Sequence, residues 1–489
     1  MAIPQEILAV ERPKSTRVKF CFGRYLVVKR TSKRVDGRVV PVELGTIGEI
    51  INGEYVQIRE EPKKKKKKEV DIKEYGTYAI CDKAAKGLLQ DLADVYDISD
   101  AKKIYAMAVL RAMDFDIKNR DLKLTYDTSY MSEEYPGIAL SENTVSTFLQ
   151  DTGMAYNRMK KFMTNRVNKF AGSSLVIDGM LKNNNSTTNS FSEYSRKGRI
   201  KGSKDLSLIY AYDIENREPV AAKPYVGNML DQTTLDDFVS EFNVTKGIII
   251  ADKGFYPALN KLKMQEKIKK GLHYIVPLKT SSRLIKDNGM YDKILTPLYN
   301  NKDKTILYKK TQIADGRFLY SFRNPSMAAD QEIGYIARTR KKCNLDETKF
   351  EDKQKEFGVI VFESYSDISP MEIYSAYERR WEIELMFNTF KNIIDFDTTN
   401  VHSDYSVYAT EFINYLSTII TCRIQKIFKT TVLKSTKNGK EKYISDEYSY
   451  KQVFRYLSKL KKFKVDNSSK WENSKTLAYI ENLTNVLGV

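Results

Sequence analysis

Four residues between positions 377 and 391 have side chains that could act together on a phosphate group. Tyr377, Arg380, Glu384 and Lys391 lie at offsets of 0, 3, 7 and 14 in the segment AYERRWEIELMFNTFKN. At about 100° per residue of an α-helix, all four fall within an arc of about 60°. Beside this arc lies an apolar face that would dock the helix on a core. That face consists of Ile383, Met386, Phe387, Phe390 and Ile394.

The stripe of polar residues has two interpretations. Amphipathic helices often carry charges at the rim of their apolar face, and the four residues could be no more than such a rim. Alternatively, Glu384 is a metal ligand, and the tyrosine and the two cations beside it bind phosphate groups. The helix alone does not decide between the two.

Two aspartates could supply further carboxylates. Asp178 closes the apolar run SSLVID, and Asp252 closes the run GIIIAD, both of which are typical of buried strands. In open mixed sheets, ligand sites form where strands end. Two neighbouring carboxylates repel each other unless a cation such as Mg²⁺ lies between them. The alternative is that both aspartates only cap their strands.

A run of cations lies between these two strands. The segment SEYSRKGRIKGSKD, residues 192–205, contains Arg196, Lys197, Arg199 and Lys201. A turn with alternating cations and glycines could follow a nucleic-acid backbone. The alternative is a solvated hairpin tip without a partner.

The composition favours a polyanionic partner. Lys and Arg number 81 against 63 Asp and Glu, which gives a formal net charge of +18, and such a balance is typical of nucleic-acid-binding proteins. The alternative is a basic soluble protein without such a partner. The chain has only two histidines, which argues against histidine general-base chemistry, and four scattered cysteines, which support neither a zinc site nor a disulfide framework. It shows no apolar leader, and its most apolar C-terminal run is too short to span a membrane.

The elements around the candidate residues indicate an α/β protein. Residues 17–58 predict short strands with an Asp-Gly hairpin turn. The segment LSENTVSTFL, with Ser141 as the expected N-cap, fits either the second helix of a helix-turn-helix or a plain helical bundle. From residue 173 the order β-β-β-α-β-α-β suits a mixed sheet flanked by helices. Strand-like pieces between 280 and 370, among them EIGYIARTR, predict a β-rich insertion.

The type, spacing and order of these residues resemble those of a known family. Tyr377-x2-Arg380-x3-Glu384-x6-Lys391 matches the YREK signature of cut-and-paste insertion-sequence transposases of the Asp-Asp-Glu type, in the insertion-sequence-four-like superfamily. VIDGM and ADKGFY match the two aspartate motifs of that family, in the right order, with a long insertion before the glutamate. The resemblance covers roughly residues 170–430.

The resemblance implies an RNase H-like core in which Asp178, Asp252 and Glu384 hold two divalent ions, Mg²⁺ or Mn²⁺. Two such ions can activate a water or a 3′-hydroxyl and stabilise the leaving oxygen of a phosphoryl displacement. The expected function is therefore DNA cleavage at transposon ends followed by strand transfer into target DNA. The alternatives are an RNase H-like nuclease that cuts without joining and a non-catalytic DNA-binding derivative, against which the three intact carboxylates argue.

The resemblance also implies how DNA is bound. Tyr377, Arg380 and Lys391 would contact phosphates near the cut end, Arg380 with two parallel hydrogen bonds and Lys391 as a point charge. The expected partners are double-stranded transposon ends and target DNA, which a homodimer would bind. The protein is expected to act in the cytoplasm at the bacterial nucleoid, with no membrane partner. The segment YATEFINYLSTIITCRIQKIF is a candidate dimer contact, although its apolar residues could equally complete the core.

These inferences divide the chain into seven parts. They are a small β-rich N-terminal region (1–62), a Lys-rich linker with six consecutive lysines (63–70), a helical, DNA-end-binding region (71–170), the first part of the RNase H-like core (171–280), the β-rich insertion (281–370), the second part of the core with the YREK helix (371–430) and a C-terminal helical region (431–489).

Overall fold

The computed structural model divides the chain into two compact units, Met1–Glu69 and Val70–Val489, and each is described by itself. The structure describes residues 2–35, 38–58, 69–115, 117–184, 186–194, 202–229, 231–245, 247–251, 271–300, 305–313, 316–341, 347–392, 398–399, 401–435, 441–465 and 470–489. At some positions inside these ranges, Lys391 among them, only the backbone is described.

The first unit is an antiparallel sheet in the order β1-β2-β3-β4. Its elements are α1 (Gln5–Ala9), β1 (Thr16–Cys21), β2 (Arg24–Val35), β3 (Arg38–Ile51) and β4 (Glu54–Gln57). The strands predicted between residues 17 and 58 are thus confirmed, and Val35 pairs with Arg38 across the expected Asp-Gly turn, which itself lies outside the described residues. Val18, Val27 and Ile50 form a small core.

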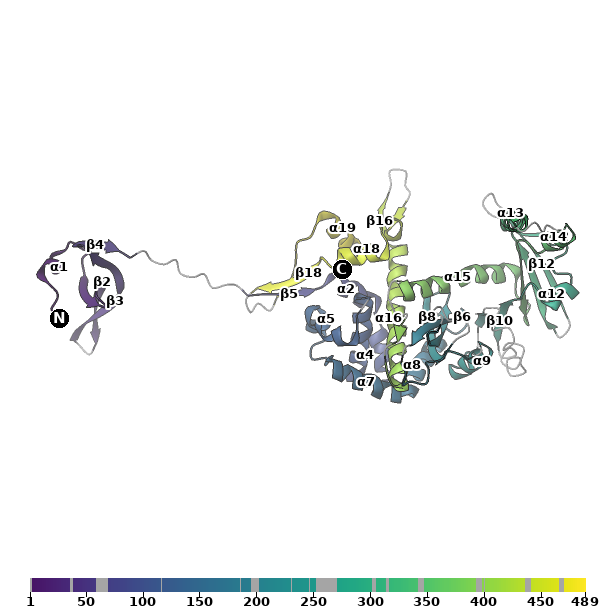
Figure 1. Cartoon of the computed structure of the whole chain (residues 1–489), viewed down its shortest axis with the longest axis horizontal. Helices are drawn as coiled ribbons and strands as arrows, with labels where there is room; N and C mark the ends of the chain where they lie inside the picture. Colours follow the sequence, from purple (N-terminus) through teal and green to yellow (C-terminus); the bar gives the residue numbers. More distant parts are fainter. Residues whose placement is uncertain are drawn as a thin grey trace. The chain divides into compact units, whose positions relative to one another are not determined.

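The second unit is organised by a 10-stranded sheet in the order β11-β12-β13-β14-β10-β9-β6-β7-β8, with the short β15 (Thr398–Thr399) paired to β6 (Figure 1). The core strands are β6 (Ser174–Asn184), β7 (Asp205–Asp213), β8 (Glu218–Val226), β9 (Gly247–Ala251) and β10 (Leu272–Pro277), with α9 (Asp231–Glu241) between β8 and β9. β6, β7 and β8 form an antiparallel meander, while β9 and β10 run parallel to β6. This order and these directions are those of an RNase H-like core.

The insertion continues the same sheet. Its strands are β11 (Thr296–Asn300), β12 (Thr305–Gln312), β13 (Phe318–Arg323) and β14 (Val359–Ser364). β14 joins them to the core, because Val276 and Pro277 of β10 pair with Glu363 and Phe362. The insertion also contains α12 (Arg283–Asp287), α13 (Pro325–Lys341) and α14 (Glu347–Gln354).

One strand expected in the insertion is a helix. The sequence pattern of EIGYIARTR predicts an extended segment, but it forms the second half of α13. The helix begins at Pro325, a residue favoured at the first helical position, and the Asn324 side chain accepts a hydrogen bond from the Met327 N–H at 3.2 Å. Tyr335 packs against Phe357, with ring centroids 5.7 Å apart, and this contact anchors the helix.

Helices before the core surround one long helix, α16 (Asp404–Thr430). They are α2 (Gly76–Ala84), α3 (Leu88–Ala93), α4 (Ile98–Met113), α5 (Leu122–Thr128), α6 (Met131–Glu134), α7 (Glu142–Met154) and α8 (Tyr156–Lys169). α16 contacts α2, α4, α7, α8 and β8. Most residues of α16 between Val407 and Ile424 are buried, so YATEFINYLSTIITC completes the core and is not open to a second protomer. Among the described helices, none has the length and apolar character needed to cross a bilayer.

The segment LSENTVSTFL is part of this helical bundle. Ser141 precedes the first residue of α7, as predicted, and its hydroxyl lies 2.7 Å from that of Thr144. Val145 and Leu149 are buried against the bundle. A buried helix face is common to both interpretations of this segment, so the helix-turn-helix and the plain helical bundle both stay predictions.

The last part of the chain is mixed, whereas the sequence predicts a helical region. It contains β16 (Val432–Ser435), β17 (Glu441–Tyr443), α17 (Ile444–Glu447), α18 (Tyr450–Leu457), β18 (Lys461–Val465), β19 (Glu472–Asn473) and α19 (Ala478–Leu487). β18 pairs with β5 (Val70–Glu74), the strand that begins the second unit. The start of this unit is therefore fixed by residues from near the other end of the chain.

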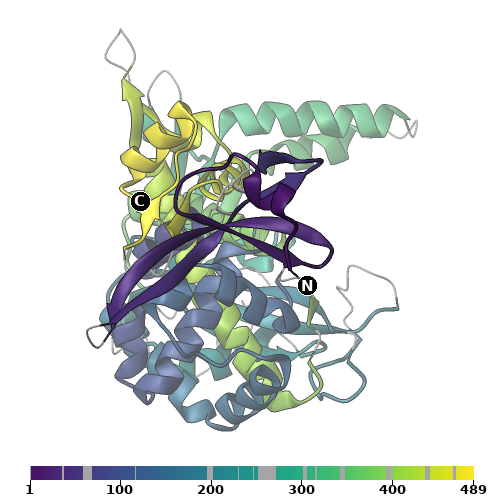
Figure 2. The ribbon, with the colours of Figure 1, turned by 90° about the vertical axis from the view of Figure 1, so that its left-hand side faces the viewer.

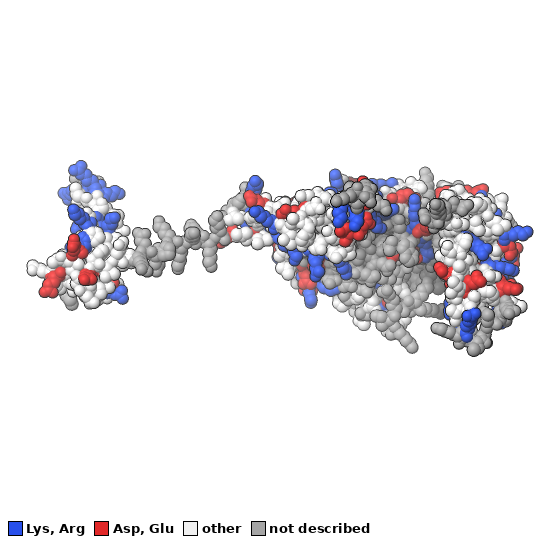
Figure 3. Space-filling model, turned by 90° about the horizontal axis from the view of Figure 1, so that it is seen from above, with Lys and Arg blue, Asp and Glu red and all other residues white. Residues whose placement is uncertain are grey.

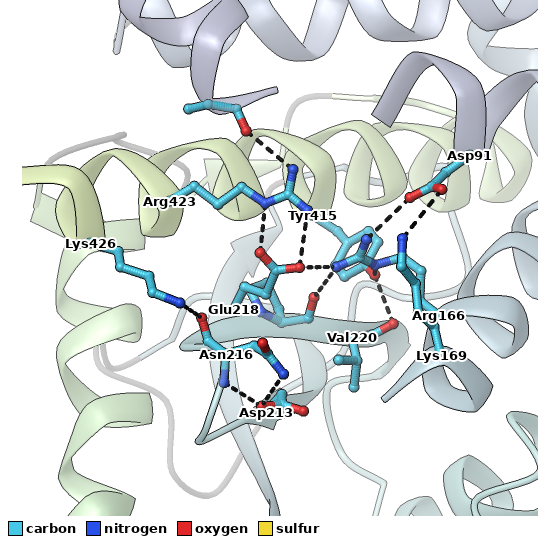
Figure 4. A network of polar contacts seen from close by, with 12 residues as sticks. Asp91, Arg166, Lys169, Asp213, Asn216, Glu218, Val220, Tyr415, Arg423 and Lys426 are labelled. Carbon is cyan, nitrogen blue, oxygen red and sulfur yellow. Dashed lines mark hydrogen bonds and ion pairs between the residues drawn. The ribbon is translucent and has the colours of Figure 1, made fainter. Parts of the chain in front are cut away.

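Glu218, at the start of β8, lies at the centre of a buried network (Figure 4). Its carboxylate accepts hydrogen bonds from Arg166 of α8 (Nη2–Oε1, 2.6 Å) and from Arg423 of α16 (Nε–Oε2, 2.6 Å). Arg423 also donates to the backbone carbonyls of Ala84 and Lys86. Burial opposes ionisation of Glu218, but the hydrogen bond from Arg423 and the charge of Arg166 outweigh it and lower its pKa. The network ties the helical bundle to the edge of the core sheet.

Candidate active site on the sheet face that carries α15

Asp178 lies in the middle of β6, on the face of the sheet that carries α15 (Pro370–Asn392). It pairs with Tyr210 of the antiparallel strand β7, and directly opposed residues of an antiparallel pair point to the same face. The Tyr210 ring contacts the Phe387 ring of α15, with centroids 6.0 Å apart. Asp178 is half-buried, and its Oδ1 accepts a hydrogen bond from the Gly179 N–H at 2.8 Å.

The prediction that the strand ends at Asp178 is wrong, because β6 continues to Asn184. The residues after Asp178 are polar and suggest a turn. They remain in the sheet because Lys182 Nζ forms a buried ion pair with Glu411 of α16 at 2.7 Å. Lys182 lies four residues beyond Asp178 and so on the same face. This face therefore meets both α15 and α16.

Asp252 lies outside the described residues. The residue before it, Ala251, ends β9 and pairs with Ile177, the residue before Asp178. Within the part of the chain that the structure describes, no group of three or more His, Cys, Asp or Glu residues is placed to hold a metal ion. The set expected from the sequence includes Asp252 and is therefore only partly described.

Glu384 is carried by α15, which docks on the core as its apolar face predicts. Ile383, Met386 and Phe387 are buried, and α15 contacts β6 and β9; the side chains of the other two residues expected on this face are not described. The Glu384 side chain keeps 39% of its exposure. Its carboxylate thus lies at the flank of the docked face, on a helix in contact with the strand of Asp178.

Arg380 and Glu384, one helical turn apart, form a loose ion pair. Arg380 Nη2 lies 3.5 Å from Glu384 Oε1, longer than the usual 2.7–2.9 Å of a charge-assisted hydrogen bond. Arg380 is only 17% exposed. A largely buried guanidinium therefore stands next to a carboxylate that is open to solvent.

Tyr377 and Lys391 mark the two ends of the stripe. The Tyr377 ring packs edge-on against Phe362 of β14, with centroids 4.9 Å apart, so the residue helps to anchor α15 on the insertion. Lys391 lies in the last turn of α15, and its side chain is not described. The other cations expected to bind DNA, Arg196, Lys197, Arg199 and Lys201, lie outside the described residues.

A cavity that the sequence did not indicate opens where α15 meets the insertion. Its volume is about 570 Å³, and Tyr377, Arg380 and Tyr374 of α15 line one wall. Lys279 and Gln331 are among the polar residues on its other sides. Burial, and then the nearby Glu378 carboxylate, raises the pKa of Tyr374 to about 12, so its hydroxyl remains protonated at neutral pH. The sequence feature that could have indicated this cavity is the spacing of Tyr374 and Tyr377, which puts both rings on one helix face.

Comparisons with known proteins bear on this site. No curated protein matches the chain significantly. Among solved structures, the chain is similar to a piggyBac transposase in a synaptic complex with hairpin DNA, at 11% identity over 78% of this chain and 79% of that one, with a TM-score of 0.37. That likeness is too weak to add to what the strand order establishes. Residues 171–413 match the family model of the transposase DDE domain, a range that contains Asp178, Asp252 and Glu384. Over these residues, the chain therefore belongs to the transposase DDE domain family.

Proposed function

We propose that this protein cuts DNA at the ends of a mobile element and joins those ends to target DNA. The observation that carries the proposal lies within the DDE domain: Asp178 and Glu384 belong to elements in contact on one face of an RNase H-like sheet. Both side chains keep partial exposure, as groups that meet a substrate must. The YREK spacing and the order of the three carboxylates support the assignment to insertion-sequence relatives.

The donor set fits divalent metal ions. Carboxylate oxygens are the ligands that Mg²⁺ and Mn²⁺ prefer, and Asp178, Asp252 and Glu384 would hold two ions. When bound, such ions supply an activated water or 3′-hydroxyl and stabilise the leaving oxygen. The half-buried position of Asp178 suits this role, because its Oδ1 is oriented by the Gly179 N–H while the sheet fixes its backbone.

The remaining residues of the stripe hold the DNA. Arg380 is positioned by its burial and by its loose pairing with Glu384, and its guanidinium can bind a phosphate with two parallel hydrogen bonds. Tyr377, Lys391 and the cations of the segment 192–205 extend this contact along the DNA backbone. The active species is a homodimer on paired ends, with its contact elsewhere than on the buried α16, and the protein acts at the bacterial nucleoid in the cytoplasm.

The test uses the full chain and DNA that flanks its reading frame. Labelled end DNA, a target plasmid and Mg²⁺ should yield cleaved ends and joined products, and EDTA should prevent both. Asp178→Asn should abolish both products, whereas Glu372→Gln, which alters an exposed glutamate on the first turn of α15, should leave them unchanged. Cleavage without joining would support a nuclease instead. Cleavage by the Asp178→Asn variant at the original rate would refute the assignment of the site.

A further inference from the structure

The longest hairpin of the first unit extends beyond its core. Its outer part, here called the arm, consists of Lys29–Arg34 of β2 and Arg38–Val42 of β3. Every described side chain of the arm is exposed, on both faces of the ribbon. Figure 2 shows the two strands as a long ribbon that leaves the rest of this unit. The small core of Val18, Val27 and Ile50 lies at the other end of the hairpin. At its base, Lys29 pairs with Thr16 and the Arg30 N–H donates to the Ser15 carbonyl. The described side chains of the arm, however, are not covered by the rest of the unit.

The arm is strongly basic. It carries Lys29, Arg30, Lys33, Arg34 and Arg38, and Figure 3 shows Lys and Arg side chains gathered at one end of this unit. The one described carboxylate at its base is Glu43, which accepts a hydrogen bond from Lys19 of β1. That bond, with smaller contributions from the charges of Arg17 and Arg30, holds the pKa of Glu43 below its ordinary value, so this carboxylate pairs mainly with a cation outside the arm.

The cations point to both faces of the ribbon. Lys33 pairs with Val40, and the next pair is Arg34 with Val39; successive cross-strand pairs face opposite sides of a sheet. Each face thus presents a cation beside an exposed valine, and Val39 and Val40 are 62% and 43% exposed. A two-stranded ribbon exposed on both sides gains little stability from its own contacts. The charge and the valines therefore suit a partner that surrounds the ribbon.

The major groove of duplex DNA is such a partner. It is about 12 Å wide and admits a two-stranded β-ribbon, whose strands lie about 4.8 Å apart. Cations on both faces would meet the phosphates on both walls of the groove. The valines between them would meet base edges, where apolar side chains contact the thymine methyl group. A strand of six residues reaches about 20 Å along the groove.

We propose that the arm binds duplex DNA by entering its major groove, and that it gives the protein a DNA contact separate from the candidate active site. The proposal rests on the proposed function only for the identity of the partner as DNA. It does not depend on the carboxylates or on a metal ion. Because the first unit joins the second through the Lys-rich segment 63–68, this contact is carried by a unit of its own.

The first experiment removes charge from the arm of the full-length protein. One variant combines Arg30→Gln, Lys33→Gln, Arg34→Gln and Arg38→Gln. The matched control combines Lys14→Gln, Arg24→Gln, Lys459→Gln and Lys475→Gln, which remove four exposed cations elsewhere. Affinity for a 30-base-pair duplex is measured by fluorescence anisotropy in EDTA, so that no outcome depends on catalysis. Thermal unfolding of both variants checks that the fold is retained.

The arm variant should bind about 10- to 1,000-fold more weakly at 0.15 M salt, and its salt slope should fall by about 0.9 for each phosphate that it no longer neutralises. The control should bind within about threefold of the original protein. Equal binding by the arm variant and the control would overturn the proposal. If Asp178→Asn abolishes DNA cleavage and leaves the affinity for the duplex unchanged, the DNA contact of the arm is independent of the proposed active site.

A second experiment tests the groove. Methylation of guanine N7, which lies in the major groove, should interfere with binding of the original protein and not with the residual binding of the arm variant. An RNA duplex of the same sequence should not show the arm-dependent gain, because its major groove is deep and narrow. If the arm variant loses affinity for RNA duplex and DNA duplex equally, the ribbon is a general polyanion surface and the groove assignment is wrong.

Discussion

Two arginine–glutamate clusters in the second unit differ in how completely their charges are paired. Glu218 is buried and accepts hydrogen bonds from Arg166 and Arg423 at 2.6 Å each. Glu384 keeps 39% of its exposure and meets Arg380 only at 3.5 Å. A fully paired buried carboxylate holds elements together but has no capacity for a substrate. A loosely paired one at the flank of a helix can still take up a metal ion, which is what the proposed chemistry needs.

The largest expected effect separates chemistry from stability. Glu384→Gln removes a metal-binding charge, and we expect DNA cleavage to fall about 1,000-fold or more, which corresponds to about 4 kcal/mol of transition-state stabilisation. The free energy of unfolding should change by less than about 0.5 kcal/mol, as for most exposed substitutions. Single-turnover cleavage in Mg²⁺ and urea denaturation measure the two quantities. A variant that unfolds readily and yet cleaves normally would reverse the roles of the two clusters.

Glu218→Ala should do the opposite. It leaves the buried Arg166 and the partly buried Arg423 without their shared carboxylate, and breaking such a buried pair costs about 3–5 kcal/mol. Urea denaturation should show this loss. The matched control is Glu215→Ala, three residues away and exposed, which should cost less than about 1 kcal/mol. Similar losses in both variants would mean that the network contributes no more than a surface residue.

Arg380 should show an intermediate effect on cleavage. Arg380→Ala removes one charge-assisted contact worth roughly 1.5–3 kcal/mol, so we expect cleavage to slow about 10- to 100-fold, with partial recovery in Arg380→Lys. The adjacent and exposed Arg379→Ala is the control. Because phosphate contacts carry no base readout, the ratio of cleavage on cognate and scrambled ends should stay unchanged. A shift in that ratio would argue against a phosphate contact.

The smallest effect is a dependence of stability on pH. The pKa of Glu218 is lowered from 4.5 in the folded chain, so its network contributes stability above that value and loses it as the pH falls through the folded pKa. We therefore expect the original protein to lose stability below pH 4.5 more steeply than Glu218→Gln. Urea denaturation at several pH values between 3 and 6 measures both slopes. Parallel slopes would contradict the lowered pKa.

The local parts of the site could be predicted from sequence, and the long-range parts could not. The helix of Tyr377 to Glu384 follows from its periodicity, and Ile383, Met386 and Phe387 are buried as that periodicity predicts. The extent of β6 could not be foreseen, because the charge of the buried Lys182 is paired with Glu411, which is 229 residues away.

Dependence on residues distant in the sequence also explains the other differences between the predicted and the observed elements. EIGYIARTR has an apolar pattern compatible with a strand, and its helical state depends on a helix start at Pro325 and on the packing of Tyr335 against Phe357. The Glu218–Arg423 pair joins residues 205 apart, and no local sequence pattern predicts such a partner. Whether Asp252 and the cations of residues 196–201 join the site stays a prediction, since they lie outside the described residues.

The pairing of β5 with β18 has a consequence for the order in which the molecule forms during synthesis. Glu74 pairs with Lys461, so the strand that begins the second unit lacks its partner until most of the chain has been translated. At about 5–20 residues per second, that interval lasts roughly 20–80 s. The first unit, which is compact by itself, can fold during this time. A ribosome-bound chain would thus expose a folded basic arm while residues of the second unit are still being added.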